Sequence, residues 1–432
     1  MPLSPLDAVQ NRRSFLGKSA AAAALLLSAK SLLPRGAFAA ASGPEVTAAK
    51  LGFIALTDSS PLIVAKEKAL FEKFGMADVE VLKQASWGAT RDNLVLGSDG
   101  SGIDGAHVLS PMPYLMTLGK ITQNNVPLPM KILARLNLDG QAISVASAYA
   151  DAKAGTDSSV LREIFAKKKA EGAMAKVAMT FPGGTHDLWM RYWLAAGGIN
   201  PDTDVETIVV PPPQMVANMK VGTMDCFCVG EPWNAQLVTQ GIGYTALTTG
   251  ELWSKHPEKS LAMRADFTEK YPKATEAILM AVMEAQQWCD ADENREELAA
   301  IVSKRAWFNV KKDDILGRLK GDIDYGTGRT ETASPHLMKF WRDDASFPFK
   351  SHDAWFLAEN QRWGKLDAGL DIKPVIAQVN GAELWRSAAK ALGVAAIPAS
   401  DSRGVETFFD GKSFDPENPQ AYLNSLSIKQ TA

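Results

Sequence analysis

Residues 175–196 read AKVAMTFPGGTHDLWMRYWLAA and contain a strand, a loop and a helix in succession. The short apolar stretch at 175–181 predicts a buried strand. A glycine-containing loop at 182–186 follows it and leads into a helix predicted over 187–196. A strand followed by a tight loop and a helix is the repeating unit of α/β folds.

The same order recurs along the chain. Apolar stretches at 50–56, 79–82, 205–210 and 225–229 are each followed by a polar or proline-containing loop and a helical pattern, which in the first case covers 62–74. Strands that alternate with helices predict largely parallel sheets. A chain of 432 residues is longer than one core usually organises, so we expect two lobes. From residue 272 the sequence indicates a mainly helical elaboration that completes the first lobe.

The first 39 residues carry the three parts of a secretory signal. Arg12 and Arg13 stand side by side ahead of an apolar run at 19–29, and the small-residue triplet 37–39 marks a cleavage site. Paired arginines in this position are typical of the twin-arginine export route. A membrane anchor is the alternative, but the run falls short of the roughly 20 apolar residues that span a bilayer. We expect a signal peptide over 1–39 and a mature protein in the periplasm.

Composition narrows the class of partner. The formal net charge is −3, and removal of the basic leader makes it more negative, so we expect no nucleic-acid partner. No long apolar segment follows residue 39, and we expect a chain that does not span the membrane. Three cysteines are too few for a disulfide scaffold. Cys226 and Cys228 are better read as buried small side chains than as a metal or redox pair.

Four side chains are candidates for a ligand site, and two of them, Trp87 and His186, stand in loops that lead from strands into helices, where ligands of α/β folds collect. Trp87 offers an indole N–H, or is simply a core residue. His186, at a predicted helix start, would be a neutral imidazole that donates one hydrogen bond, or a capping residue. Gln141 could direct its amide into a cleft or bond backbone at a turn. Lys259 alone is typical of a surface lysine.

Familiar catalytic motifs do not occur. The sequence has no Gly-x-Ser-x-Gly elbow, no phosphate loop ending in Gly-Lys-Ser/Thr, no Gly-x-Gly-x-x-Gly and no His-Glu-x-x-His. The glycine-rich stretch at 181–185 lacks the lysine of a nucleotide loop and suits an oxyanion better. We therefore expect a binding protein that is not an enzyme.

The stretches 86–92, 137–143, 181–200 and 256–259, together with the leader, resemble the nitrate- and bicarbonate-binding proteins of bacterial ABC importers, the NrtA/CmpA family. The resemblance covers essentially the whole mature chain. It implies an α/β, two-lobed periplasmic-binding-protein fold of type II, each lobe a mostly parallel sheet flanked by helices, with a largely helical C-terminal elaboration. Lobe I would comprise 45–143 plus 258–432, and lobe II 144–257.

The resemblance also implies a ligand set. Matching positions assign nitrate binding to Trp87, Gln141, His186 and Lys259, with further donors from Gly88 and Thr185. The bicarbonate-binding branch carries an acid in the position of Lys259 and recruits calcium. A lysine there implies binding of nitrate, which only accepts hydrogen bonds, without a metal or cofactor. Nitrite, similarly small, is expected to bind too.

The implied function is capture of nitrate in the interlobe cleft and delivery to an ABC permease with cytoplasmic ATPase subunits, by a monomer. One alternative is a bicarbonate-binding protein of the same family. A second is a cytoplasmic nitrate sensor, against which the leader argues. A third is an enzyme related to thiamine-precursor synthases, of which Cys226 and Cys228 are a faint echo.

Overall fold

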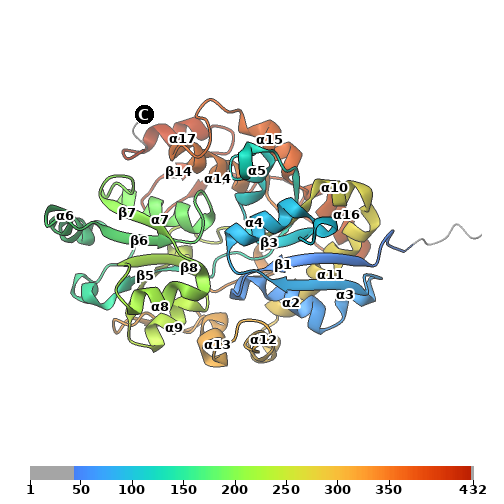
Figure 1. Cartoon of the computed structure of the whole chain (residues 1–432), viewed down its shortest axis with the longest axis horizontal. Coiled ribbons are helices and arrows are strands. Elements are labelled where there is room, and N and C mark those ends of the chain that lie inside the picture. Colours follow the sequence, from blue (N-terminus) through green and yellow to red (C-terminus); the bar gives the residue numbers. More distant parts are fainter. Residues whose placement is uncertain (1–42, 430–432) are drawn as a thin grey trace, which may run out of the picture. The chain divides into compact units, whose positions relative to one another are not determined.

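The first sheet combines strands from two distant parts of the chain. The computed structural model describes residues 43–429, so the expected leader lies outside the described residues. The sheet contains β1 (Ala48–Phe53), β2 (Asp78–Lys83), β3 (Gly105–Leu109), β4 (Met130–Arg135) and β10 (Lys259–Arg264). Its strand order is β2-β1-β3-β10-β4, with only β10 antiparallel to its neighbours (Figure 1).

The second sheet repeats this topology. It contains β5 (Gln141–Ala146), β6 (Ala175–Met179), β7 (Val205–Val209), β8 (Cys226–Gly230) and β9 (Gly243–Thr248). The order is β7-β6-β8-β5-β9, and β5 is the antiparallel strand. The expectation of two mostly parallel sheets is therefore confirmed, with one reversed strand in each.

The reversed strands are the ones that the chain enters after crossing between the sheets. It passes from β4 to β5 through residues 136–140 and returns from β9 to β10 through 249–258. Gln141 is the first residue of β5, and Lys259 is the first residue of β10. The fold therefore brings these two positions to the crossing, although they are far apart in the sequence.

Helices flank both sheets. Those that contact the first sheet, or a helix that does, are α2 (Ser60–Glu67), α3 (Leu70–Lys73), α4 (Trp87–Leu96), α5 (Met112–Thr117), α10 (Ala265–Lys270), α11 (Pro272–Asp290) and α16 (Ala382–Leu392). For the second sheet they are α6 (Arg162–Ala170), α7 (Thr185–Ala196), α8 (Met215–Lys220) and α9 (Trp233–Thr239). The single helix predicted over 62–74 is wrong, because Ala69 adopts a left-handed conformation (φ 55°) that separates α2 from α3.

The C-terminal third contacts both sheets' helices. It contains α12 (Arg295–Val302), α13 (Lys312–Lys320), α14 (Lys350–Arg362), α15 (Ile372–Val379) and α17 (Pro419–Ser425), and the hairpins β11 (Ile323–Asp324)–β12 (Thr330–Glu331) and β13 (Glu406–Thr407)–β14 (Ser413–Phe414). α15 packs on α5, whereas α14 packs on α7 and α13 on α9. This segment, which we expect to complete the first lobe, therefore also contacts helices of the second sheet. The lobe boundaries given above stay a prediction.

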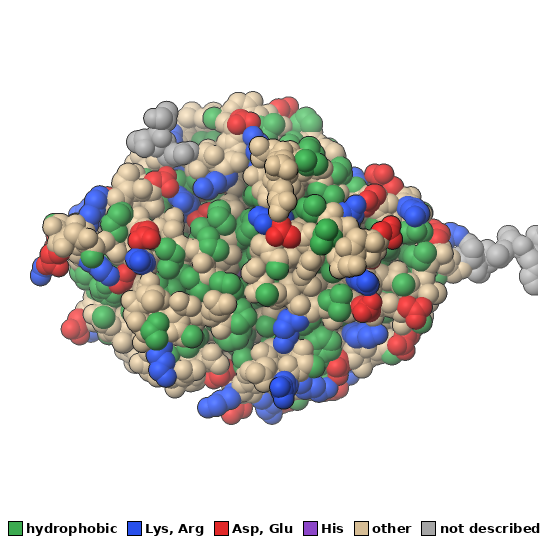
Figure 2. Space-filling model, viewed as in Figure 1, with side chains coloured by type: hydrophobic (Ala, Val, Ile, Leu, Met, Phe, Trp, Pro, Cys, Tyr) green, Lys and Arg blue, Asp and Glu red, His purple; other side chains and the backbone are tan. Residues whose placement is uncertain are grey.

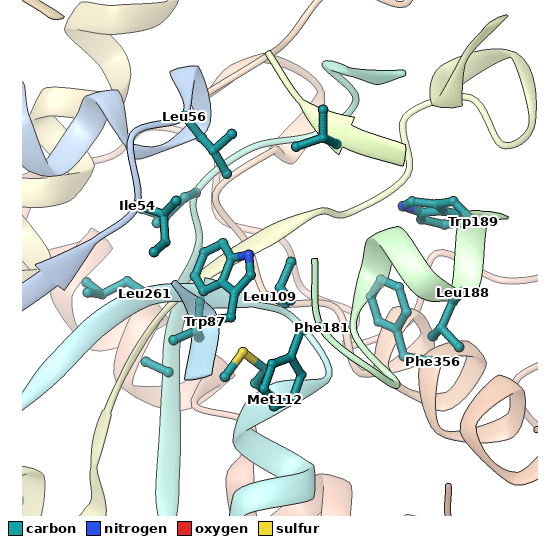
Figure 3. Packing of buried hydrophobic residues seen from close by; sticks show 14 of the residues in the cluster. Ile54, Leu56, Trp87, Leu109, Met112, Phe181, Leu188, Trp189, Leu261 and Phe356 are labelled. Atoms are coloured by element: carbon teal, nitrogen blue, oxygen red, sulfur yellow. The ribbon is translucent and has the colours of Figure 1, made fainter. Parts of the chain in front are cut away.

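Apolar side chains fill the space between these layers. Trp87 is buried among Ile54, Leu109, Met112 and Leu261 in Figure 3. All three cysteines are buried and free, as expected. Charged side chains of both signs are interspersed over the face shown in Figure 2. No helix within residues 43–429 is long and apolar enough to cross a membrane.

Candidate functional site

The loop before α7 is held by local constraints. Gly183 has φ +73°, and a Cβ there would lie 2.6 Å from Oδ1 of Asn360 on α14. The backbone N–H of Gly183 donates to Oδ2 of Asp187 at 2.8 Å, which closes the loop onto the helix. No side chain caps the helix at Gly184. The first-turn N–H groups of α7 thus lack helical partners and give this end partial positive charge.

Lys259 is completely buried and lies between two carboxylates. Its Nζ lies 3.0 Å from Oδ2 of Asp58 and 2.9 Å from Oε1 of Glu258. Burial alone would lower the pKa of Lys259, but Asp58 and Glu258 outweigh it and raise the pKa above its ordinary value. The interpretation of Lys259 as a surface lysine is wrong, because this side chain is a fixed interior positive charge.

Gln141 and His186 continue the polar cluster from the second sheet. The amide of Gln141 donates to Oδ2 of Asp58 at 2.9 Å, and its Oε1 lies 2.8 Å from Nε2 of His186. Gln141 directs its side chain to other side chains and does not close a backbone turn. The acceptor at Oε1 places the imidazole proton of His186 on Nε2. Nδ1 lies 2.6 Å from the hydroxyl of Thr180.

The surroundings of His186 favour a neutral imidazole. Burial first, and then the charge of Lys259, hold the pKa of His186 well below its ordinary value. Its Nε2 lies 3.3 Å from Nζ of Lys259. The protein therefore places a neutral donor directly beside a permanent cation.

Glu258 gathers three donors from both sides of the crossing. Thr185, the first residue of α7, donates its hydroxyl to Oε1, which also accepts from Lys259. The indole of Trp189, one turn later on α7, donates to Oε2 at 2.6 Å. Glu258 is therefore an ion-paired acceptor that ties α7 to the start of β10.

Trp87 begins α4 and is completely buried, and within the described residues its Nε1 has no hydrogen-bond partner. Its ring centroid lies 5.1 Å from that of His107, whose Nε2 donates to Oδ1 of Asp58 at 2.6 Å. A buried donor without a partner costs about 1–3 kcal/mol, so this N–H is suited to a ligand. Gly88 is half-buried, and a Cβ there would approach only Ser86, so sterics do not demand glycine.

Sequence reasoning missed Asp58, His107 and Glu258. Asp58 lies in the polar loop that follows β1, at the strand end where ligands gather, and this placement was an available signal. Glu258 directly precedes Lys259, and adjacent residues of opposite charge are typical of a solvent-exposed surface. His107 lies within the apolar strand β3. The described residues contain no group of three or more His, Cys, Asp or Glu that could hold a metal.

Comparison with known proteins identifies the family of this chain. A model of the NMT1-like family matches residues 42–303. The nitrate/nitrite binding protein NrtA of Synechocystis sp. PCC 6803 is 62% identical over 391 residues, which are 90% of this chain and 86% of that protein. The chain belongs to the NrtA/CmpA family.

A second relative comes from the other branch of the NrtA/CmpA family. The bicarbonate-binding protein CmpA of Synechococcus elongatus is 44% identical over 406 residues, covering 91% of this chain and 89% of that protein. The crystal structure of the periplasmic nitrate-binding protein NrtA from Synechocystis superposes with a TM-score of 0.88, covering 90% of this chain and 100% of that chain. The family and the periplasmic-binding-protein fold expected from the sequence are thus confirmed.

Proposed function

We propose that this member of the NrtA/CmpA family captures nitrate, and also nitrite, at the cluster around Lys259 and delivers it to an ABC importer. The burial of Lys259 beside His186 carries the proposal. Nitrate is a monoanion that only accepts hydrogen bonds, so it needs donors and one compensating cation. The cluster supplies both. NrtA, with 62% identity over most of the chain, is named for binding nitrate and nitrite.

The donors that we assign to the anion come from both lobes. The ammonium of Lys259, Nε2–H of His186 and the unpartnered indole N–H of Trp87 are the principal ones. The remaining donors would come from Gln141, Thr185 and Gly88. Because Lys259 already occupies the position between Asp58 and Glu258, the protein supplies its own cation there. We therefore propose that the anion binds without a metal.

Bicarbonate is the second candidate, because its hydroxyl could donate to a carboxylate of Asp58 or Glu258. CmpA, at 44% identity, is named for binding it. Each of these carboxylates already accepts hydrogen bonds from three donors in this structure. A bicarbonate hydroxyl would compete with these donors for the carboxylate oxygens, whereas nitrate has no proton to donate to them.

The same proposal covers the rest of the expected role. The protein acts by binding, without catalysis, as a periplasmic monomer exported through the twin-arginine route. Lobe I (45–143 plus 258–432) and lobe II (144–257) close over the anion, and the closed form docks on a permease served by cytoplasmic ATPases. Replacing Arg12 and Arg13 with lysine tests the route, because cell fractionation should then find the precursor in the cytoplasm.

Isothermal titration calorimetry tests the ligand. Residues 40–432, freed of bound anion by unfolding and refolding, are titrated with nitrate, nitrite and bicarbonate, each with calcium or with EDTA. We expect saturable binding of nitrate and nitrite that EDTA does not change. Binding of bicarbonate with calcium, and of nothing else, would overturn the assignment of the anion and leave the fold and family unchanged.

A further inference from the structure

The charges buried around Lys259 do not balance once an anion is added. Asp58 and Glu258 are negative, Lys259 is positive, and all three are completely buried. Nearby charges are paired among themselves: Asp139 with Lys339 at 2.8 Å, and Asp187 with Arg191 at 2.7 Å.

The cluster thus carries a net charge of −1 when its histidines are neutral, and bound nitrate would make it −2. Uncompensated charge away from water is strongly unfavourable.

The two carboxylates are poor acceptors for a compensating proton. Asp58 accepts from His107, Gln141 and Lys259. Glu258 likewise accepts from Lys259, Thr185 and Trp189. A proton on either carboxyl would remove the negative charge that strengthens these hydrogen bonds and that holds the ion pair with Lys259.

The contacts of His107 also disfavour a second proton on its ring. The backbone N–H of Ile54 donates to Nδ1 of His107 at 3.4 Å, so the imidazole proton lies on Nε2 and points to Asp58. A second proton on Nδ1 would meet the N–H of Ile54. Burial, despite the charge of Asp58, holds the pKa of His107 below its ordinary value.

His186 faces groups that would accept hydrogen bonds from both of its nitrogens. Nε2 lies 2.8 Å from Oε1 of Gln141 and 3.4 Å from Oε1 of Glu258. Nδ1 lies 2.6 Å from the hydroxyl of Thr180, and a hydroxyl can turn from donating to accepting. Lys259 and the positive end of α7 oppose protonation of His186. An anion that accepts from both Lys259 and His186 would offset both of them.

His256 is the other histidine near the cluster. Its Nδ1 lies 3.1 Å from the carbonyl of Pro257 and its Nε2 lies 2.7 Å from the hydroxyl of Thr249. Nδ1 is also 3.6 Å from Oε2 of Glu258. The hydrogen bonds of His256 are to Thr249 and Pro257, whereas Nε2 of His186 is 3.3 Å from the ammonium of Lys259. An anion bound by Lys259 therefore lies beside His186.

We propose that the site binds nitrate together with one proton, which is taken from solvent and held by His186. This inference rests on the proposed function. The proton goes onto Nδ1 while the hydroxyl of Thr180 turns to accept it, and Nε2–H becomes a charged donor to the anion. The occupied cluster then keeps the net charge that it has without the anion.

Calorimetry in buffers of different ionisation enthalpy counts the proton. Nitrate is titrated at pH 7.5 in phosphate, HEPES and Tris, and the observed enthalpy is plotted against the ionisation enthalpy of the buffer. We expect a slope that corresponds to uptake of about one proton, and a Kd that rises about tenfold per pH unit at alkaline pH.

A zero slope with saturable nitrate binding would overturn the inference, whereas no nitrate binding at any pH would overturn the proposed function instead. The raised pKa of Lys259 keeps its charge from changing in this range.

Two matched variants locate the proton. His186→Gln keeps a neutral hydrogen-bonding side chain, and we expect weaker nitrate binding without proton uptake. His256→Gln is the control and should keep uptake of about one proton. Loss of uptake in His256→Gln with retention in His186→Gln would overturn the assignment. If His186→Gln binds no nitrate, ¹⁵N imidazole NMR of the wild type decides: protonation of both ring nitrogens of His186 on adding nitrate supports it, and an unchanged neutral ring refutes it.

Discussion

The ammonium of Lys259 lies 3.0 Å from a carboxylate oxygen of Asp58, and neither side chain is exposed to solvent. Asp58 belongs to the loop after β1, whereas Lys259 opens the strand that returns from the second sheet. The contact fixes the cation where the two sheets meet. It also means that any ligand of Lys259 must coexist with a carboxylate already bound to the same ammonium.

Replacing Lys259 should remove both the anion site and much of the stability. In Lys259→Gln two buried carboxylates lose their cation, and we expect the free energy of unfolding to fall by about 3–5 kcal/mol. We expect nitrate affinity to fall at least about 100-fold, since truncating a buried charge partner costs about 2–5 kcal/mol in binding. Urea denaturation and calorimetry measure the two effects. Lys68→Gln, at a partly exposed ion pair with Glu297, is the control. A folded Lys259→Gln protein with unaltered affinity would contradict the role of this residue.

The indole N–H of Trp87 can be removed without changing a charge. Trp87→Phe should weaken nitrate binding about 10- to 100-fold, the worth of one hydrogen bond to a charged group. The matched control is Trp355→Phe in α14, because the indole nitrogen of Trp355 is also buried without a partner among the described residues. Both variants lose ring volume, so both should lose some stability. Equal affinity loss in the two would show that packing, and not the N–H of Trp87, matters to the anion.

The glycine before α7 tests how the loop positions His186. In Gly183→Ala the methyl group would meet Asn360 at 2.6 Å, in addition to the cost of about 1–2 kcal/mol for alanine at positive φ. Gly172→Ala is the control, because Gly172 has φ +88° with nothing within 4 Å of the added methyl group. We expect both variants to lose stability in thermal unfolding, but only Gly183→Ala to lose nitrate affinity. Unchanged affinity in Gly183→Ala would mean that the loop adapts without moving the site.

A buried histidine outside the site should make stability depend on pH. Burial lowers the pKa of His352 to about 3, and neither ring nitrogen has a hydrogen-bond partner within the described residues. The unfolded chain therefore binds a proton between about pH 6.5 and 3 that the folded protein does not, and stability falls as pH falls through this range. His352 should account for up to about 4–5 kcal/mol of that loss. We expect urea denaturation of His352→Gln to show a flatter pH dependence than that of wild type. His336→Gln, at a half-buried position, is the control, and equal slopes in all three proteins would refute the assignment.

The strand–loop–helix order was predictable because it depends on local sequence patterns: short apolar stretches, loop residues and helical spacing of apolar side chains. The sequence identified the strands that became β1, β2, β6, β7 and β8 and placed His186 at the start of α7. The interruption of the helix at Ala69 was not predictable, because alanine rarely adopts a left-handed backbone conformation. Propensity describes the average conformation of a residue, whereas the packing of α2 and α3 decides this one.

The polar partners in the site were harder to predict than its donors. Asp58 meets Lys259 only because the chain crosses twice between the sheets, and no spacing in the sequence encodes that approach. Glu258 next to Lys259 is typical of a solvated surface pair, and burial reverses this interpretation. Sequence reasoning therefore named the donors that we propose for the anion and missed the negative charges of Asp58 and Glu258, which change the electrostatics of the cluster.

The C-terminal third gives the two halves of the molecule a further mechanical link. If the two crossing segments, 136–140 and 249–258, were the only connections, they would act as a simple hinge between the lobes. In Figure 1, α14 lies toward the top of the view and α13 toward the bottom. Asn360 of α14 donates to the carbonyl of Gly183 at 3.1 Å, and Asp314 of α13 accepts from the hydroxyl of Thr239 at 3.1 Å, so both helices are tied to the part of the chain that carries the second sheet. Contacts on two sides restrict the movement of the second lobe to what these helices allow. If the lobes close over the anion as proposed, we expect these helices, which supply none of the proposed anion donors, to limit how far the lobes open and so how fast the anion leaves.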